Sequence, residues 1–99
     1  MDADEIRTLL GDNIFERAKK YRKRIQQSTC TVNADGVRHI SAMVQGSGGS
    51  YYYTQAWLRE NGSFVSASCS CPYNQNGEGT YCKHIGALLL DCLLYTSPS

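Results

Sequence analysis

The stretch "SCSCPYNQNGEGTYCKHIGALLL", residues 68–90, decides how this chain is organised, because it places three of the five cysteines and one histidine in two pairs. One residue separates Cys69 from Cys71, and one residue separates Cys82 from His84. Residues two apart in an extended strand point to the same side, so Cys69 and Cys71 at the end of a strand can direct both sulfurs at one point. Regular helix geometry would put such residues on nearly opposite sides. The second pair therefore fits best at a helix start, with Cys82 before the helix and His84 in its first turn.

The spacer between the pairs supports a common site. Its ten residues, Pro72 to Tyr81, are polar and contain glycine, so we expect a flexible loop that brings the second pair back to the first. Three thiolates and one imidazole form a closed tetrahedral site, the usual composition of a structural zinc. Sulfur ligands disfavour magnesium and calcium, which prefer oxygen. We therefore predict one structural zinc ion as the cofactor.

Two other interpretations of the same residues are weaker. The cysteines could be free structural residues beside a surface histidine, but that would leave the paired spacing unexplained. A disulfide between Cys69 and Cys71 would close a very tight and strained ring. An odd number of cysteines also fits a disulfide framework poorly.

The residues before this stretch predict helices followed by a sheet. Residues 2–10 have the apolar spacing of a short helix, and a second helix is expected to begin with Asn13 as its cap and to end near Gln27. From residue 28 onward β-branched and aromatic residues dominate. Glycine and asparagine turns at 34–36, 46–50 and 61–62 separate four expected strands. Such short connections make neighbouring strands antiparallel.

These elements define the predicted fold class and its parts. We expect an α+β fold with N-terminal helices, a four-stranded antiparallel meander, a zinc-binding loop and a C-terminal helix. One domain holds all the parts: a helical segment 1–27, a sheet 28–68, and the zinc-binding segment with its helix 69–91. Residues 40, 42 and 44 alternate toward one face, whereas residues 51–58 are apolar on both faces and leave their buried face undecided.

The last eight residues, "CLLYTSPS" at 92–99, have a different origin in our interpretation. They resemble the translation of a transposase adapter end used in the preparation of sequencing libraries. The other interpretation is an ordinary Ser- and Pro-containing tail. We expect 92–99 to be a non-native tail, so Cys92 is given no functional role.

Composition restricts the possible environment and partners. The 99 residues carry a net charge of +1, which argues neither for nor against a polyanionic partner. No apolar stretch is long enough to span a bilayer, and the acidic N-terminus lacks the pattern of a secretory signal. We expect a cytoplasmic, reducing location with no membrane partner. A catalytic cysteine would need a base beside it, and the paired ligands explain Cys82 and His84 better, so we predict neither an enzyme nor a small-molecule substrate.

A basic segment, "ERAKKYRKR" at 16–24, is the candidate nucleic-acid surface. It could neutralise phosphates, or it could be the ordinary solvated face of the second helix, which opposes the stripe of Ile14, Ala18, Tyr21 and Ile25. Tyrosines 51–53 could likewise stack on bases or simply pack within the sheet. The basic candidates are Arg17, Lys19, Lys20, Lys23 and Arg24. Two other residues, His39 and Cys30, are expected to be an ordinary strand residue and a small apolar filler.

Several of these features together resemble a known family. "CSCPY", a variable loop and "CKHIGALLL" are similar to the SWIM-type zinc finger, whose pattern is C-x-C, a spacer and C-x-H. The upstream "FERAKKY" and the strand ending in "VQGS" are similar to its bacterial form. The resemblance covers most of residues 10–91, and its ligand pattern is the specific part.

The resemblance implies both a site and a role. It carries the metal ligands of the family to Cys69, Cys71, Cys82 and His84. SWIM modules act as DNA-binding or protein-interaction elements, and the bacterial form often precedes a Swi/Snf-like helicase. We therefore expect a DNA or protein partner and the N-terminal part of such a helicase. The alternative is a stand-alone protein–protein adaptor that does not bind nucleic acid.

Overall fold

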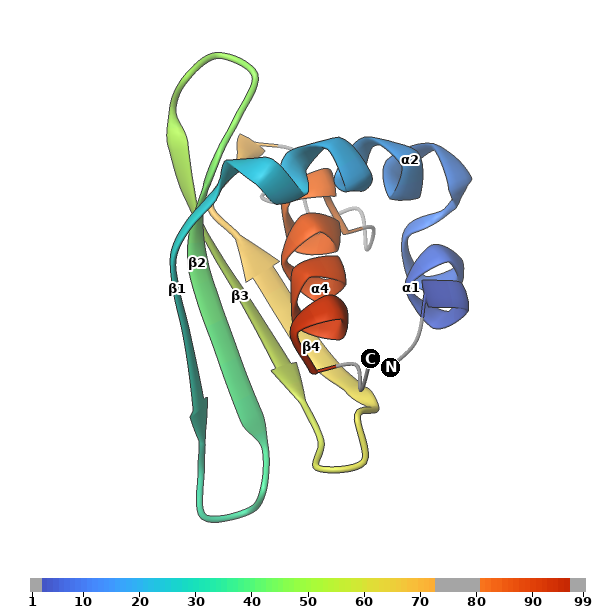
Figure 1. Ribbon diagram of the computed structural model, residues 1–99, viewed down its shortest axis with the longest axis vertical. Helices are drawn as coiled ribbons and strands as arrows, with labels where there is room; N and C mark the ends of the chain where they lie inside the picture. Colours follow the sequence, from blue (N-terminus) through green and yellow to red (C-terminus); the bar gives the residue numbers. More distant parts are fainter. Residues whose placement is uncertain (1–2, 73–80, 97–99) are drawn as a thin grey trace.

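The computed structural model describes residues 3–72 and 81–96, and it confirms the predicted α+β class. Two helices and one turn of 3-10 helix precede four strands, and a longer helix follows them (Figure 1). Most of the predicted loop Pro72–Tyr81 lies outside the described residues. The elements are α1 (Ala3–Leu10), α2 (Asp12–Tyr21), η1 (Arg22–Arg24), β1 (Ile25–Val32), β2 (Arg38–Gln45), β3 (Tyr51–Leu58), β4 (Phe64–Cys69) and α4 (Lys83–Thr96).

The sheet is the predicted antiparallel meander in the order β1-β2-β3-β4. Each hairpin has its own turn chemistry. In the first, the Asn33 side chain accepts hydrogen bonds from the backbone N–H groups of Asp35 and Val37, both at 2.9 Å. In the third, Gly62 takes a φ of 89°, a left-handed conformation that glycine adopts without strain. These local turns fix the register, in which Ile40 lies opposite Ala56 and Ala56 opposite Ala67.

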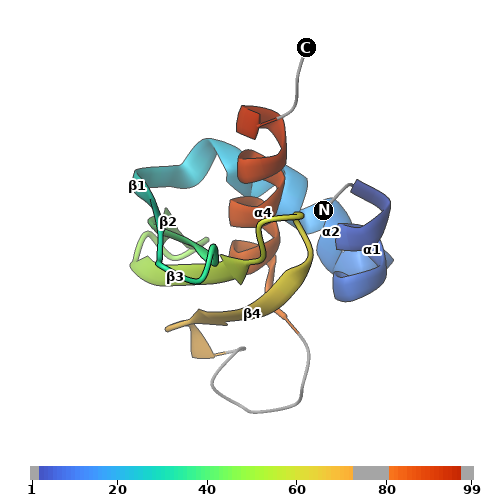
Figure 2. The same cartoon turned by 90° about the horizontal axis from the view of Figure 1, so that it is seen from below.

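The described helices all lie on one face of the sheet (Figures 1 and 2). Ile40, Ala42 and Val44 of β2 point toward them, as their alternation predicts. The structure also decides the orientation of β3, because Thr54, Ala56 and Leu58 are buried. Tyr51 and Tyr53 consequently face outward with 44% and 45% of their surface exposed, whereas Tyr52 lies on the inner face.

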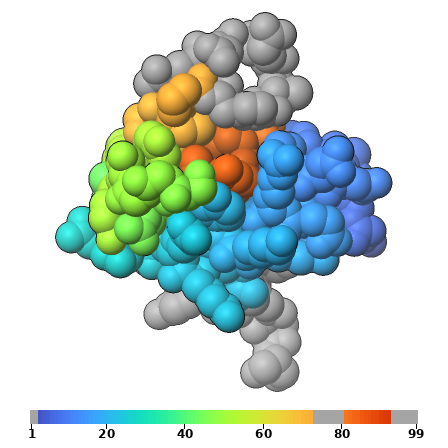
Figure 3. All heavy atoms as spheres, turned by 90° about the horizontal axis from the view of Figure 1, so that it is seen from above, coloured from blue at the N-terminus to red at the C-terminus, as the bar shows by residue number. Residues whose placement is uncertain are grey.

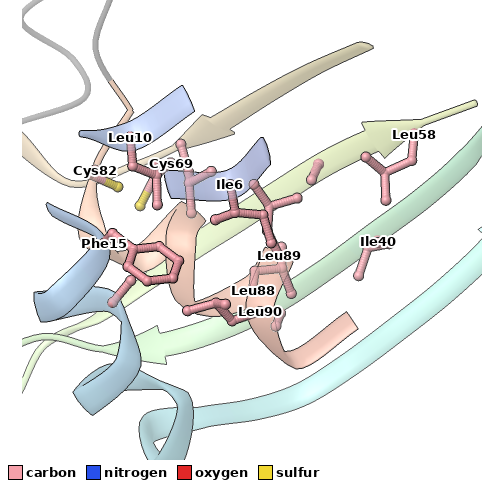
Figure 4. Packing of buried hydrophobic residues seen from close by; sticks show 14 of the residues in the cluster. Ile6, Leu10, Phe15, Ile40, Leu58, Cys69, Cys82, Leu88, Leu89 and Leu90 are labelled. Carbon is pink, nitrogen blue, oxygen red and sulfur yellow. The ribbon is translucent and has the colours of Figure 1, made fainter. Parts of the chain in front are cut away.

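Helix α4 is the centre of the core (Figure 4). The expected residues Ile85, Leu88 and Leu89 are buried, and so are the residues between and after them up to Leu90. A helix that is apolar on all sides requires cover on all sides. The sheet supplies it on one side, and α1 and α2 supply it on the other with Ile6, Leu10, Phe15 and Ala18.

The boundary between the second helix and the first strand differs from the prediction. Helix α2 ends at Tyr21, so the prediction of a helix reaching Gln27 is wrong. Ile25 pairs with Val44 as the first residue of β1, which shows that sheet pairing overrides its helical spacing. A register shift between Gln26 and Thr29, where Gln27 has a φ of 54°, lets the strand begin this early.

Strand β1 is an exposed edge. Only Ile25 of its eight residues is partly buried, and Val32 is 65% exposed. Cys30 is exposed as well, so the prediction that it is a small apolar filler is wrong. The physical reason is that α4 packs over β2, β3 and β4 and leaves β1 uncovered. Among the described residues, no helix is both long and apolar enough to cross a membrane.

Candidate metal centre

The four predicted ligands come together at the junction of β4 and α4. Cys69 is the last residue of β4, and Cys71 follows in the bend after it. Cys82 directly precedes α4, and His84 lies in its first turn. All four are buried, with exposed fractions between 2% and 6%. Their potential ligand atoms all lie within 4.8 Å of one another.

The orientation of His84 fits this cluster. Its Nδ1 atom lies 3.7 Å from the sulfur of Cys69 and 3.7 Å from the sulfur of Cys82. A tetrahedral zinc with Zn–S bonds of ~2.3 Å and Zn–N bonds of ~2.1 Å would separate such ligand atoms by about 3.6–3.8 Å. Two tyrosines hold the imidazole ring, Tyr21 edge-on at 5.4 Å and Tyr52 tilted at 5.0 Å between ring centroids.

Two of the sulfurs, those of Cys69 and Cys82, have strongly shifted pKa values. A hydrogen bond from Cys82 lowers the pKa of Cys69 to about 4 against the effect of burial, with further help from His84, Thr54 and the backbone of Cys71. The same contact raises the pKa of Cys82, and burial raises it further. The pair therefore consists of a Cys69 thiolate and a Cys82 thiol, and the thiol shares its proton with the thiolate. This donor set suits a divalent cation that prefers sulfur, since the cation can replace the shared proton.

This arrangement predicts that zinc binding releases protons. Cys69 is already ionised above about pH 4, whereas the raised pKa of Cys82 keeps its proton in place until the metal displaces it. Apparent zinc affinity should therefore rise with pH, by about tenfold per pH unit for each proton released. Competition with a coloured chelator at two pH values one unit apart measures this slope. An affinity independent of pH would show that the thiols are not the ligands.

A hydroxyl group and two backbone groups support the sulfurs. The Thr54 hydroxyl lies 3.4 Å from the Cys69 sulfur. Backbone N–H groups of Cys71 and Ile85 face the sulfurs of Cys69 and Cys82 and favour their charged forms. Contacts of this kind orient metal ligands and tune their basicity. Sequence spacing did not indicate Thr54, because it lies on a different strand from every ligand.

The structure separates the five basic candidates, which are all exposed. Lys19 forms an ion pair with Glu16 at 3.1 Å and lies over the Phe15 ring, whereas Arg17 lines the cavity beside the metal centre. Arg24 lies over the Tyr21 ring and donates a 3.1 Å hydrogen bond to the carbonyl oxygen of Gly46. Lys20 and Lys23 have no ion pair or cation–π contact among the described residues.

A further cation, Lys83, was not among these candidates. Its ammonium lies 4.8 Å from the centre of the Tyr21 ring. Burial alone would raise the pKa of Tyr21, but a hydrogen bond and the charge of Lys83, a hydrogen bond with Ser47 and the charge of Arg24 outweigh it and lower that pKa. The sequence feature that could have indicated Lys83 is its position between two predicted ligands at the start of a helix. That position places it beside the metal centre.

A cavity of about 170 Å³ adjoins the centre on this side. Cys71, Cys82 and His84 form one wall, and Arg17 and Lys83 contribute cationic side chains. Figure 3 shows the hollow: the start of α4, in orange, lies at its floor between the green β2–β3 hairpin and the blue helix α2. No carboxylate is among the described residues that line it.

Comparison with known proteins identifies the segment that contains the cluster. The family model of the SWIM zinc finger matches residues 52–93. This span takes in most of β3, all of β4, the four clustered residues and the first eleven residues of α4. No match to the chain was found among curated proteins or among solved structures. The match agrees with the resemblance in the sequence and with a buried cluster suited to one structural zinc ion.

Proposed function

We propose, from the match of residues 52–93 to the SWIM zinc finger, that the chain is a non-catalytic binding module that contacts DNA. Cys69, Cys71, Cys82 and His84 hold one structural zinc. Four protein ligands leave no open position for substrate or water, as is usual for structural zinc. Zinc therefore supplies stability, and the surface beside it supplies binding.

The observation that carries the DNA assignment is the gathering of cations around Tyr21 and the cavity beside the metal centre. Arg24 of η1 and Lys83 of α4 lie over the Tyr21 ring, and Arg17 of α2 lines the same cavity as Lys83. The fold thus gathers charges that are far apart in the sequence. The chain as a whole is nearly neutral. A local cationic surface on a nearly neutral chain is what contact with a phosphate backbone requires.

A competing explanation is that these cations only balance the zinc centre. One Zn²⁺ with three thiolates carries a net charge of −1, and Lys83 lies next to it. That explanation accounts for one cation but not for three. A purely protein-binding adaptor is the second candidate, and it predicts no salt-sensitive affinity for DNA.

The experiment compares two double variants that remove the same charge. Arg17→Gln/Arg24→Gln removes one cation that lines the cavity and one that lies over the Tyr21 ring, whereas Arg7→Gln/Lys19→Gln removes two cations that lie over the Phe15 ring. Binding of the zinc-loaded chain to a labelled DNA duplex is measured between about 50 and 200 mM salt. We expect the first variant to reduce the slope of log K against log salt by about 1.8, since each phosphate contact contributes about 0.9. The control should keep nearly the full slope.

Two results would contradict the proposal. Equal effects of the two double variants would mean that only net charge matters. No salt-sensitive binding by the unaltered chain would favour the adaptor.

The proposal extends to the setting of the module. The resemblance to the bacterial form supports a natural protein in which the module is linked to a Swi/Snf-like helicase. Three thiolate ligands support a reducing, intracellular location, because oxidation to disulfides would remove them. Determining the natural gene sequence beyond the codon for Asp91 tests the first point, and a helicase region there is the expected result.

A further inference from the structure

One residue that lines the cavity beside the zinc centre has a polar atom without a hydrogen-bond partner among the described residues. His84 is only 4% exposed, and its Nε2 atom is buried without a hydrogen bond to any described residue. The other ring nitrogen, Nδ1, is the one that faces the cysteine sulfurs. When Nδ1 binds a metal, Nε2 carries the hydrogen and becomes a donor. A buried donor without an acceptor costs free energy, so we expect a bound group to supply an acceptor at this wall of the cavity.

The close approach of the hairpin to Nε2 depends on a glycine. A Cβ atom built on Gly46 would lie 3.6 Å from Nε2 and 2.6 Å from a ring carbon of Tyr52. Any larger residue at position 46 would push the Tyr52 ring and narrow the space beside the histidine. The β2–β3 hairpin thus approaches the metal centre closely, and Gly46, Tyr52 and His84 together line this part of the cavity.

The remaining walls are rich in donors. Arg17 reaches the cavity from α2, Ser47 from the hairpin turn and Lys83 from the first turn of α4. The N-terminus of α4, a helix of 14 residues, adds the positive end of its dipole. Arg17 and Lys83 together exceed the −1 charge of a zinc tris-thiolate centre by one positive charge. The cavity can therefore attract an anion even though two sulfurs line it.

We propose that this cavity binds one phosphate group of a nucleic-acid backbone. The donors approach from three elements, which suits a tetrahedral anion with several oxygens better than a planar carboxylate with two. Arg17 and Lys83 supply charge, and Ser47 and His84 Nε2 supply neutral hydrogen bonds. This inference rests on the proposed DNA-binding function and assigns its central contact. It also couples the contact to zinc, because the metal fixes which nitrogen of His84 donates.

Inorganic phosphate is the direct probe of the cavity. The zinc-loaded full chain, labelled with ¹⁵N, is titrated with phosphate at constant ionic strength while backbone and histidine ring signals are followed. We expect the largest shifts at Ser47, Lys83 and the Nε2–H of His84. Arg17→Gln should weaken phosphate binding by about tenfold, as expected for one charge-assisted contact. Lys20→Gln removes the same charge from the same helix outside the cavity and should weaken it by less than about twofold.

A structural effect is separated from a binding effect by zinc content and melting temperature, which both variants should leave unchanged. Ser47→Ala provides a second, uncharged variant and should also weaken phosphate binding. Equal effects of Arg17→Gln and Lys20→Gln, or shifts spread over all surface cations, would overturn the cavity as a phosphate site.

The titration also distinguishes the cavity from the wider function. DNA binding that persists with no localised phosphate shift would overturn the cavity and leave the DNA-binding proposal in place. Localised phosphate binding without affinity for a DNA duplex or single strand would support the cavity and overturn its assignment to nucleic acid.

Discussion

His84→Ala should leave the chain without stoichiometric zinc and largely unfolded. Binding free energies of structural zinc sites are about 10–16 kcal/mol in small peptides, which equals or exceeds the total stability of about 5–15 kcal/mol expected for a domain. The loss should reach the whole core, because the residue after His84 begins the buried run of α4 that contacts the sheet, α1 and α2. Thermal unfolding followed by circular dichroism, with zinc content measured in parallel, checks this expectation.

The matched control for this variant is Cys30→Ser. Cys30 also has a thiol that could bind a metal, but it is exposed on β1 and lies outside the cluster. It should retain one zinc and an unchanged melting temperature. Chelation of the unaltered chain should reproduce the effect of His84→Ala. A His84→Ala variant that kept both stoichiometric zinc and its melting temperature would show that His84 is not a ligand.

Gly86→Ala should destabilise the chain, although alanine normally favours a helix over glycine by about 1 kcal/mol. A Cβ atom at position 86 would lie 2.7 Å from the Cβ of Ala18 and 2.6 Å from a terminal carbon of Leu10. Leu10 can turn aside, but the Cβ of Ala18 is fixed to the backbone of α2, so the two helices must separate. Such overpacking costs about 1–3 kcal/mol. Urea denaturation measures the free energy of unfolding.

Two further variants test the cause of this effect. Gly48→Ala adds the same methyl group in open space within the β2–β3 turn and should change stability by less than about 0.5 kcal/mol. Ala18→Gly combined with Gly86→Ala removes the clashing Cβ and should recover part of the loss. A stabilising Gly86→Ala would mean that α2 and α4 do not approach as closely as described.

Local sequence signals were sufficient for the sheet and for the cluster. Turn residues such as Asn33 and Gly62 act through their own backbone or side chain within a few residues, so they predict hairpins directly. The two-residue spacing of Cys69 and Cys71 likewise encodes a shared direction without any tertiary information. The four side chains that this reasoning selected are the ones that the fold brings together.

The features that were missed depend on contacts between distant residues. Ile25 continues the apolar spacing of α2, and only its pairing with Val44 makes it a strand residue. Strand β3 is apolar on both faces, so its orientation depended on where α4 lies. Lys83 becomes part of a cationic surface only because α2 and η1 place Tyr21 beside it. Composition and periodicity contain no information about such placements.

Thiol reactivity of the purified chain, combined with its zinc content, tests the central claim most directly. With one zinc per chain, the exposed Cys30 should react at once, and the half-buried Cys92 should react more slowly because burial raises its pKa. Cys69, Cys71 and Cys82 should react only after a chelator removes the metal. The predicted result is thus one zinc, two reactive thiols before chelation and five after it. No zinc and five thiols that react together under native conditions would contradict the account.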